Sequence, residues 1–196
     1  MKTTTQIILI AMALLSAGAA GPKAYAVVPP PDGGYPGGNT AEGQAALLSL
    51  TSGQFNTAVG FWSLRSDTTA SVNTAVGAGA LLLNTAEGNT ATGAGALLSN
   101  TTGIENTASG ESALFSSNTG DRNTAFGANV LVSNTGGSFN VGVGFNALGD
   151  NTTGASNVAL GANTLSSNVS AAITRLLALS PALTAPGMGM SLSARA

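Results

Sequence analysis

The sequence contains no cysteine and no histidine among its 196 residues, and only 7% of them are charged. The lack of cysteine excludes disulfides and thiolate chemistry. The lack of histidine removes the commonest catalytic base and the commonest metal ligand. The six Lys and Arg form no basic cluster that would attract phosphate backbones, so we expect no nucleic-acid partner. We therefore expect no enzyme, no cofactor, no catalytic residue and no metal site.

Large apolar side chains are also scarce. Aromatic residues make up 5% of the chain, and much of the 43% apolar content is alanine. So little bulky material cannot fill a wide core. The composition favours a narrow fold with additional burial by partner chains.

What the sequence does contain is a tandem repeat, most complete as Asn-Thr-Ala-Val-Gly at residues 56–60. Successive copies start 17 residues apart, with one step of 16. Tandem copies at so short a period indicate stacked coils, so we predict an all-β fold, a parallel β-solenoid of eight 16–17-residue coils. Counting each Asn as position 1, coils 1 to 8 start at Asn39, Asn56, Asn73, Asn89, Asn106, Asn123, Asn140 and Asn157.

Two further positions never vary, and each invariance has a physical interpretation. Glycine at position 5 predicts a positive φ or a close approach of the next coil. Leucine at position 9 predicts an apolar spine inside the coils. These residues are Gly43, Gly60, Gly77, Gly93, Gly110, Gly127, Gly144 and Gly161, and Leu47, Leu64, Leu81, Leu97, Leu114, Leu131, Leu148 and Leu165.

The Asn at position 1 predicts a ladder of side-chain amides that bond the coils above and below, because stacked amides pair in this way in cross-β structures. Alanine at position 3, replaced only by Gly142, predicts a constriction that admits one methyl group. We expect two short strands and two corners in each coil. The one-residue deletion falls in a turn at residues 84–88, where a solenoid tolerates it.

The segments outside the repeats differ in composition. Residues 1–26 have the features of a secretory signal peptide, with Lys2, an apolar run and Ala24-Tyr25-Ala26 at the cleavage site. The alternative is an uncleaved anchor, but the run is shorter than the roughly 20 residues of a membrane span. Residues 27–38 form a Pro/Gly-rich leader, which either covers the first coil or is a plain linker.

The repeats span residues 39–173 and are followed by an irregular tail or cap at residues 174–196. Residues 174–179 are apolar enough for a short helix that ends before Pro181. The different composition of this tail also raises the hypothesis of a truncated or frame-shifted gene. The sequence does not decide between these alternatives.

Three sets of side chains are candidates for contacts. The variable position 4, from Glu42 to Leu160, is apolar enough to face a neighbouring chain. Phe61, Trp62 and Phe145 form a possible contact patch for a glycan or protein, or fill space between protomers; we favour the space between protomers. A column of threonine at position 2 raises the possibility of ice binding, with members Thr40, Thr57, Thr74, Thr90, Thr107 and Thr124.

Two patterns suggest chemistry but are better explained by structure. Residues 142–147 match the loose dinucleotide pattern G-x-G-x-x-A, but no βαβ context surrounds them. Glu105 and Asp121 lie near the same corner of adjacent coils, where hydrolysis would need paired carboxylates. A solvated pair is the expected arrangement.

The repeat Asn-Thr-Ala-Val-Gly, then Ala-Leu, then Asn-Thr-Thr-Gly resembles the head repeats of YadA-like trimeric autotransporter adhesins. It is also similar to repeat-bearing phage tail-fibre proteins. The resemblance covers roughly residues 39–173 and implies a left-handed β-roll that forms a homotrimer. The period of 17 is longer than usual for these heads, and neither heptads nor alternating strands follow residue 173.

These observations predict an exported, non-enzymatic β-solenoid, extracellular or at the outer cell surface, with no transmembrane span in the mature chain. The predicted role is structural or adhesive, binding host, matrix or neighbouring cells through the repeat surface. The alternatives are a tail-fibre-like shaft without its own ligand and an ice-binding solenoid. The sequence identifies neither the ligand, nor the anchor, nor the repeat face that forms the interface.

Overall fold

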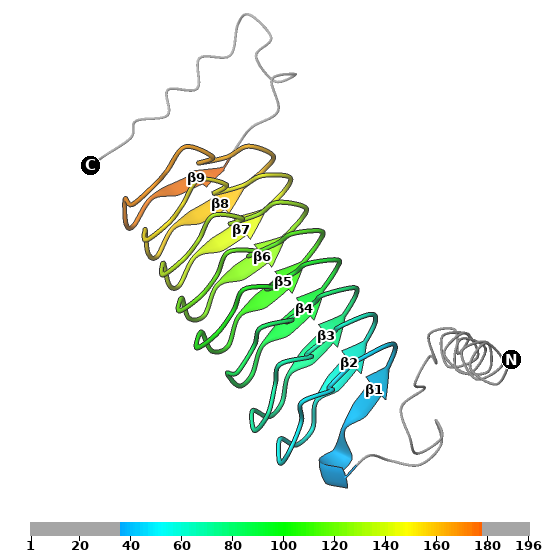
Figure 1. The fold of residues 1–196 in the computed structure, drawn as a ribbon. Helices are drawn as coiled ribbons and strands as arrows, with labels where there is room; N and C mark the ends of the chain where they lie inside the picture. The colour runs from blue at the N-terminus through cyan, green and yellow to red at the C-terminus, as the bar shows by residue number, and fades with distance from the viewer. Residues whose placement is uncertain (1–35, 178–196) are drawn as a thin grey trace, which may run out of the picture.

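The computed structural model describes residues 36–177, whose strands lie side by side in a single parallel sheet along the rod (Figure 1). Each strand consists of the three residues after position 1, and it pairs with the strand one repeat further on. The elements are η1 (Pro36–Gly38), β1 (Thr40–Glu42), β2 (Thr57–Val59), β3 (Thr74–Val76), β4 (Thr90–Thr92), β5 (Thr107–Ser109), β6 (Thr124–Phe126), β7 (Val141–Val143), β8 (Val158–Leu160) and β9 (Arg175–Leu177). The predicted parallel β-solenoid of about eight coils is therefore confirmed.

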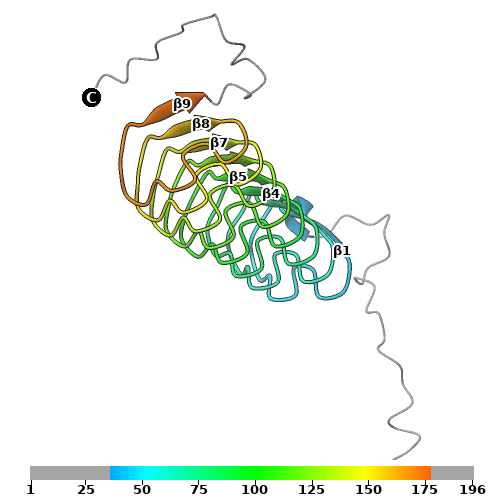
Figure 2. The same cartoon turned by 90° about the horizontal axis from the view of Figure 1, so that it is seen from above.

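The expectation of two strands per coil is wrong, because each coil forms one strand. The opposite side of each coil is nevertheless bonded to its neighbours: the Leu64 N–H donates to the Ala80 carbonyl at 3.0 Å. Positions 7 and 9 on this side have left-handed backbones, as at Trp62 (φ 61°) and Leu64 (φ 47°). A strand needs extended φ values, so these residues cannot belong to one. Figure 2 shows the resulting wound loops beside the single sheet.

The coil pattern also continues beyond its expected end at residue 173. The helix expected for residues 174–179 is wrong in its described part, because Arg175 to Leu177 form β9 and pair with β8. Thr174 takes the place of the position-1 Asn, and its N–H donates to Asn157 Oδ1 at 2.8 Å. The rest of the tail, the signal peptide and residues 27–35 lie outside the described residues.

The interior is lined by small and medium side chains. Leu64 through Leu148 in the leucine spine are fully buried, Leu47 is 8% exposed at the first coil, and Leu165 is partly buried at the last. The position-3 alanines are at most 2% exposed. The predicted apolar spine and methyl-sized constriction are thus both present.

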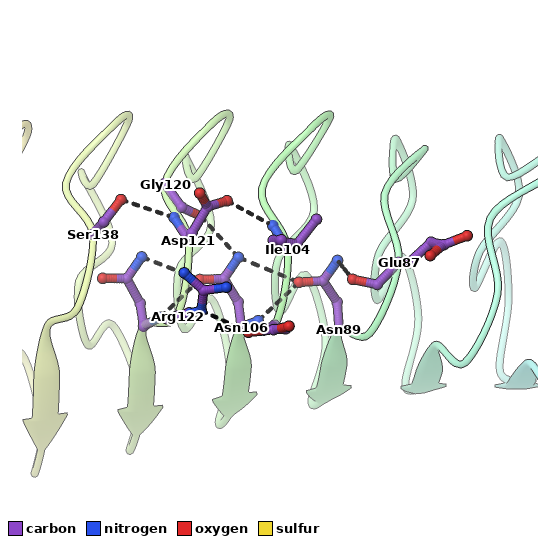
Figure 3. A network of polar contacts seen from close by, with 10 residues as sticks. Glu87, Asn89, Ile104, Asn106, Gly120, Asp121, Arg122 and Ser138 are labelled. Carbon is purple, nitrogen blue, oxygen red and sulfur yellow. Dashed lines mark hydrogen bonds and ion pairs between the residues drawn. The ribbon is translucent and has the colours of Figure 1, made fainter.

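The predicted amide ladder is also present, although most of its bonds run to backbone rather than between side chains (Figure 3). In each coil the Oδ1 of the position-1 Asn accepts the backbone N–H of the next one; Asn106 Oδ1 and the Asn123 N–H lie 2.9 Å apart. Asn106 Nδ2 donates to the Gly120 carbonyl at 2.8 Å. Side-chain amides pair directly in part of the ladder, as from Asn106 Nδ2 to Asn89 Oδ1 at 3.2 Å.

A second polar column runs through the interior at position 12, and sequence reasoning interpreted it only as a turn. Asn100 Nδ2 donates to Asn84 Oδ1 at 2.7 Å and to the Gly103 carbonyl at 2.9 Å. The column is buried or partly buried along its length. Its polar members are Asp67, Asn84, Asn100, Ser117, Asn134, Asn151 and Asn168, and Leu50 occupies this position in coil 1.

Position 5 requires glycine for both of the predicted reasons. Gly60 has φ +130°, and a Cβ added to it would lie 2.6 Å from the Gly77 carbonyl oxygen. No side chain fits that distance, because the backbone of the next coil occupies the space. The close stacking of the coils at this corner therefore depends on the glycine column.

Candidate interaction surface

All seven aromatic side chains in the described residues are on the outside of the solenoid, between 36% and 64% exposed. The interior consists of alanine, leucine and asparagine, so the aromatic side chains do not contribute to the core. Exposed apolar groups of this kind mark contact surfaces when they gather. The seven are Phe55, Phe61, Trp62, Phe115, Phe126, Phe139 and Phe145.

The three residues of the predicted contact patch do not lie together: Phe61 and Trp62 are neighbours, and Phe145 lies elsewhere on the solenoid. The Phe61 and Trp62 rings stack with centroids 4.5 Å apart, and the Arg65 guanidinium lies 5.0 Å from the Trp62 ring centroid. Phe145 occupies the same repeat position as Phe61 but belongs to coil 7, five coils away. At roughly 4.8 Å per coil, Phe61 and Phe145 are about 24 Å apart. They therefore belong to two separate candidate contact sites at the same repeat position.

The outer face of the sheet carries positions 2 and 4, because position 3 points inward in every strand up to β8. On β1 to β5 this face bears threonine, serine, two valines and Glu42. On β6 to β9 it becomes apolar apart from Thr124 and Arg175. We call this the apolar end of the sheet face; it consists of Phe126, Val141, Val143, Val158, Leu160 and Leu177.

Threonine forms two columns, of which sequence reasoning identified only one. The identified column, Thr40 to Thr124, lies on the outer sheet face in register from β1 to β6. The second column, at position 13, was missed because it lies in the turn. Its hydroxyls bond to the next coil: Thr51 Oγ1 donates to the Thr68 carbonyl at 2.8 Å and Thr152 Oγ1 to that of Val169 at 3.0 Å.

The two acids considered for paired-carboxylate chemistry have other partners. Glu105 forms an exposed ion pair with Arg122 Nε at 2.7 Å. Asp121 Oδ1 accepts the Ile104 N–H at 2.9 Å (Figure 3). Within residues 36–177 no three acidic side chains gather as a metal site would require.

One carboxyl group is buried in the position-12 column, where most coils have asparagine. Asp67 Oδ1 accepts the Ala70 N–H at 3.0 Å, and Asp67 Oδ2 accepts Asn73 Nδ2 at 3.3 Å. Asn73 starts the short coil and its amide donates to this carboxylate, whereas in other coils the position-1 amide donates to the carbonyl 14 residues further on. Desolvation by burial raises the pKa of Asp67 to about 6, against the lowering effect of these hydrogen bonds.

We expect this carboxyl group to make stability depend on pH. Between pH 4 and 6 the folded chain holds a proton that the unfolded chain has lost, so the free energy of unfolding falls as pH rises. The expected loss is about 1–2 kcal/mol after allowance for screening by solvent. Urea unfolding at pH 4, 5, 6 and 7 should show this loss in the wild type and not in Asp67→Asn. Glu105→Gln, which changes an exposed acid, should still lose stability between pH 4 and 6. If Asp67→Asn lost as much stability as the wild type over this range, the assignment to Asp67 would be contradicted.

Comparison of the chain with family models, curated proteins and solved structures gave no match. Across the described range of 36–177 we find no helix of the length and apolar character needed to span a membrane. The candidate interaction surfaces are therefore identified from the described residues alone. They are the apolar end of the sheet face, the threonine column at position 2 of the same sheet and the separate aromatic sites.

Proposed function

We propose that the chain is an exported structural or adhesive β-solenoid that forms a homotrimer and contacts host, matrix or neighbouring cells through its repeat surface. The observation that carries the proposal is the outward placement of every aromatic side chain in residues 36–177. A protein that meets only water gains nothing from this placement, whereas buried aromatic groups dominate the energy of interfaces. No part of this proposal requires catalysis.

The apolar end of the sheet face is the surface that we assign to the contact between copies. Phe126 is 62% exposed and Leu177 is 57% exposed, and Val143 and Leu160 continue the same column between them. Burying such side chains gains about 25 cal/mol per Å² of apolar area. A sheet face is also regular, so identical copies can meet in one register. Trimerisation itself is supported by the resemblance of the repeats.

Adhesion is assigned to contacts outside that face, including the stacked Phe61 and Trp62. Each coil adds another copy of a similar surface. Several weak contacts along the rod can therefore bind the same partner surface with a high combined affinity. The test compares cells that carry the gene with cells that lack it, on matrix-coated surfaces and in self-aggregation. Antibody raised against residues 36–177 should label intact carrier cells. Labelling only after lysis, with equal adherence of both strains, would refute the proposal.

The threonine column favours a second candidate, ice binding, because its members lie in register on one face of the sheet from β1 to β6. Position 4 beside it is mixed, with Val59 and Val76 but also Glu42. Thermal hysteresis of the purified protein distinguishes the candidates. A hysteresis that is lost in Thr74→Lys would move ice binding ahead of adhesion.

A further inference from the structure

A column of residues lines one corner of the solenoid, at the residue of each coil that directly precedes position 1 of the next. Each backbone N–H in this column donates to the preceding coil, as from Arg122 to the Ile104 carbonyl and from Phe139 to the Asp121 carbonyl, both at 3.0 Å. The residues are therefore held in register along the rod, about 4.8 Å apart. We call them the corner column; in coil order they are Phe55, Val72, Gly88, Glu105, Arg122, Phe139, Ser156 and Ile173.

The corner column carries large apolar side chains on a backbone that suits them poorly. Val72 has φ 56° and Ile173 has φ 61°, although β-branched residues rarely adopt a positive φ. Both are exposed, at 57% and 73%, and so are Phe55 and Phe139 at 64% and 52%. In the isolated chain these side chains are strained and wet, so they gain stability only where another surface covers them.

Position 7 shows what this backbone ordinarily selects. It is left-handed in every coil and lies outside the core, as the corner column does. Apart from Trp62, its residues are small or carry an amide, which are the types that tolerate this conformation. They are Ala45, Gly79, Gly95, Ser112, Asn129, Asn146 and Asn163.

Two opposite charges occupy the centre of the corner column. Arg122 Nε lies 2.7 Å from Glu105 Oε2, and the side chains are 49% and 56% exposed. The Arg122 guanidinium also lies 5.6 Å from the Phe139 ring centroid. This geometry leaves guanidinium N–H groups and carboxylate lone pairs free to bond outward.

The order of residues in the corner column is complementary to its own reverse. Turning a second copy end for end about the midpoint between Glu105 and Arg122 places each of these charges opposite its counterion. A parallel copy in register would instead oppose like charges, which is costly. Beyond the charges, the turn opposes a large side chain to a small residue twice and then two large apolar side chains, in the pairs Phe139 with Gly88, Val72 with Ser156 and Phe55 with Ile173.

We propose that two copies of the chain bind each other antiparallel through the corner column, in an isologous contact. Two acids, Glu87 and Asp121, lie one residue before the column. In the antiparallel pair they face Ser138 and Ile104 of the second copy, so neither meets an acid at its own level. The contact uses a corner of the coil rather than the apolar end of the sheet face, and it is additional to the proposed trimer.

The contact is narrow, because one column of eight residues forms a ridge only about 34 Å long. Such a ridge buries less than the roughly 1,200 Å² of a standard stable interface, so the pairing is weak and reversible. We therefore expect it at sub-millimolar concentration and not at the micromolar concentration of a size-exclusion experiment.

Charge reversal at the centre of the corner column tests the pairing. Sedimentation equilibrium of the chain beginning at Val27, at low salt, should show a wild-type mass that rises at least twofold between micromolar and sub-millimolar concentration. Glu105→Arg and Arg122→Glu each place like charges at both central contacts and should weaken this association by on the order of 10-fold or more. Glu111→Arg makes the same change of charge at an exposed residue outside the column and should associate like the wild type.

An equal mixture of Glu105→Arg and Arg122→Glu shows whether the two charges meet between copies. In the mixed antiparallel pair both central contacts again join opposite charges, so the mixture should associate although neither variant does so alone. Three results would overturn the proposal: a wild-type mass that stays constant, single reversals that associate like the wild type, or a mixture that stays apart while both variants keep the wild-type circular dichroism.

Discussion

Asn106→Ala is expected to destabilise the solenoid by about 3–5 kcal/mol. The substitution leaves the buried N–H of Asn123 without an acceptor and the Gly120 carbonyl without a donor, because both bond to the Asn106 amide. Each buried backbone group left unsatisfied costs about 1–3 kcal/mol, and the lost side-chain volume adds a cavity. Urea unfolding followed by far-UV circular dichroism measures the change.

Asn118→Ala is the matched control, because Asn118 is exposed at position 13 of the same coil. Its substitution should change stability by no more than about 1 kcal/mol. Equal effects of the two substitutions would contradict the assignment of a structural role to the buried ladder.

The second large effect is a coupling between Val130 and Gly142. Position 8 is alanine in most coils but valine at residue 130, and position 3 is alanine in every coil except coil 7, where it is Gly142. A Cβ added to Gly142 would lie 2.5 Å from Val130 Cγ1. The glycine therefore makes room for the larger side chain in the neighbouring coil.

A double-mutant cycle makes this coupling measurable. Gly142→Ala alone should cost about 1–3 kcal/mol through overpacking, and Val130→Ala alone about 2 kcal/mol through a cavity. The double variant restores alanine at both positions and should be close to the wild type in stability, so the coupling equals the sum of the two single costs, about 3–5 kcal/mol. As a control, Gly142→Ala is combined with Val132→Ala, which changes a half-buried valine two residues after Val130. The destabilising effects of these two substitutions should be additive. Additivity in both pairs would show that the residues do not compensate each other.

The fold was predictable because three repeat positions never vary. Asn56, Gly60 and Leu64 recur in every coil at the same position, and for each residue type the structure bears out the physical explanation predicted for it. Invariance within one chain carries this information because every coil must meet the same neighbours. Strand count was less predictable, since the left-handed φ of Leu64 is unusual for leucine and has no signature in composition.

The position-12 column shows why a polar interior is difficult to recognise. Asn100-Thr101-Thr102-Gly103 has the composition of a solvated turn, yet Asn100 is fully buried while Thr102 is exposed. The available signal was the recurrence of Asn at one spacing from Asn84 to Asn168, with Asp67 and Ser117 as polar substitutes. Turn composition alone does not distinguish an inward amide from an outward one.

The contact surface was the least predictable part. Sequence alternation does not reveal which face of a strand is outward, so position 4 was only a candidate for an interface. Phe61 and Phe145 share a column, but their separation by five coils follows only once the coils are stacked. The apolar end of the sheet face emerges when β6 to β9 are placed side by side.

The most direct test of the proposed assembly is the absolute mass of the chain beginning at Val27, by light scattering after size exclusion. We expect three times the mass of the single chain, and dissociation in Val143→Asp, which places a charge on the apolar end of the sheet face. Ser99→Asp, on the opposite side of the coil, should leave the mass unchanged. A folded single-chain species in the wild type would contradict the trimer and leave that face without its assigned partner.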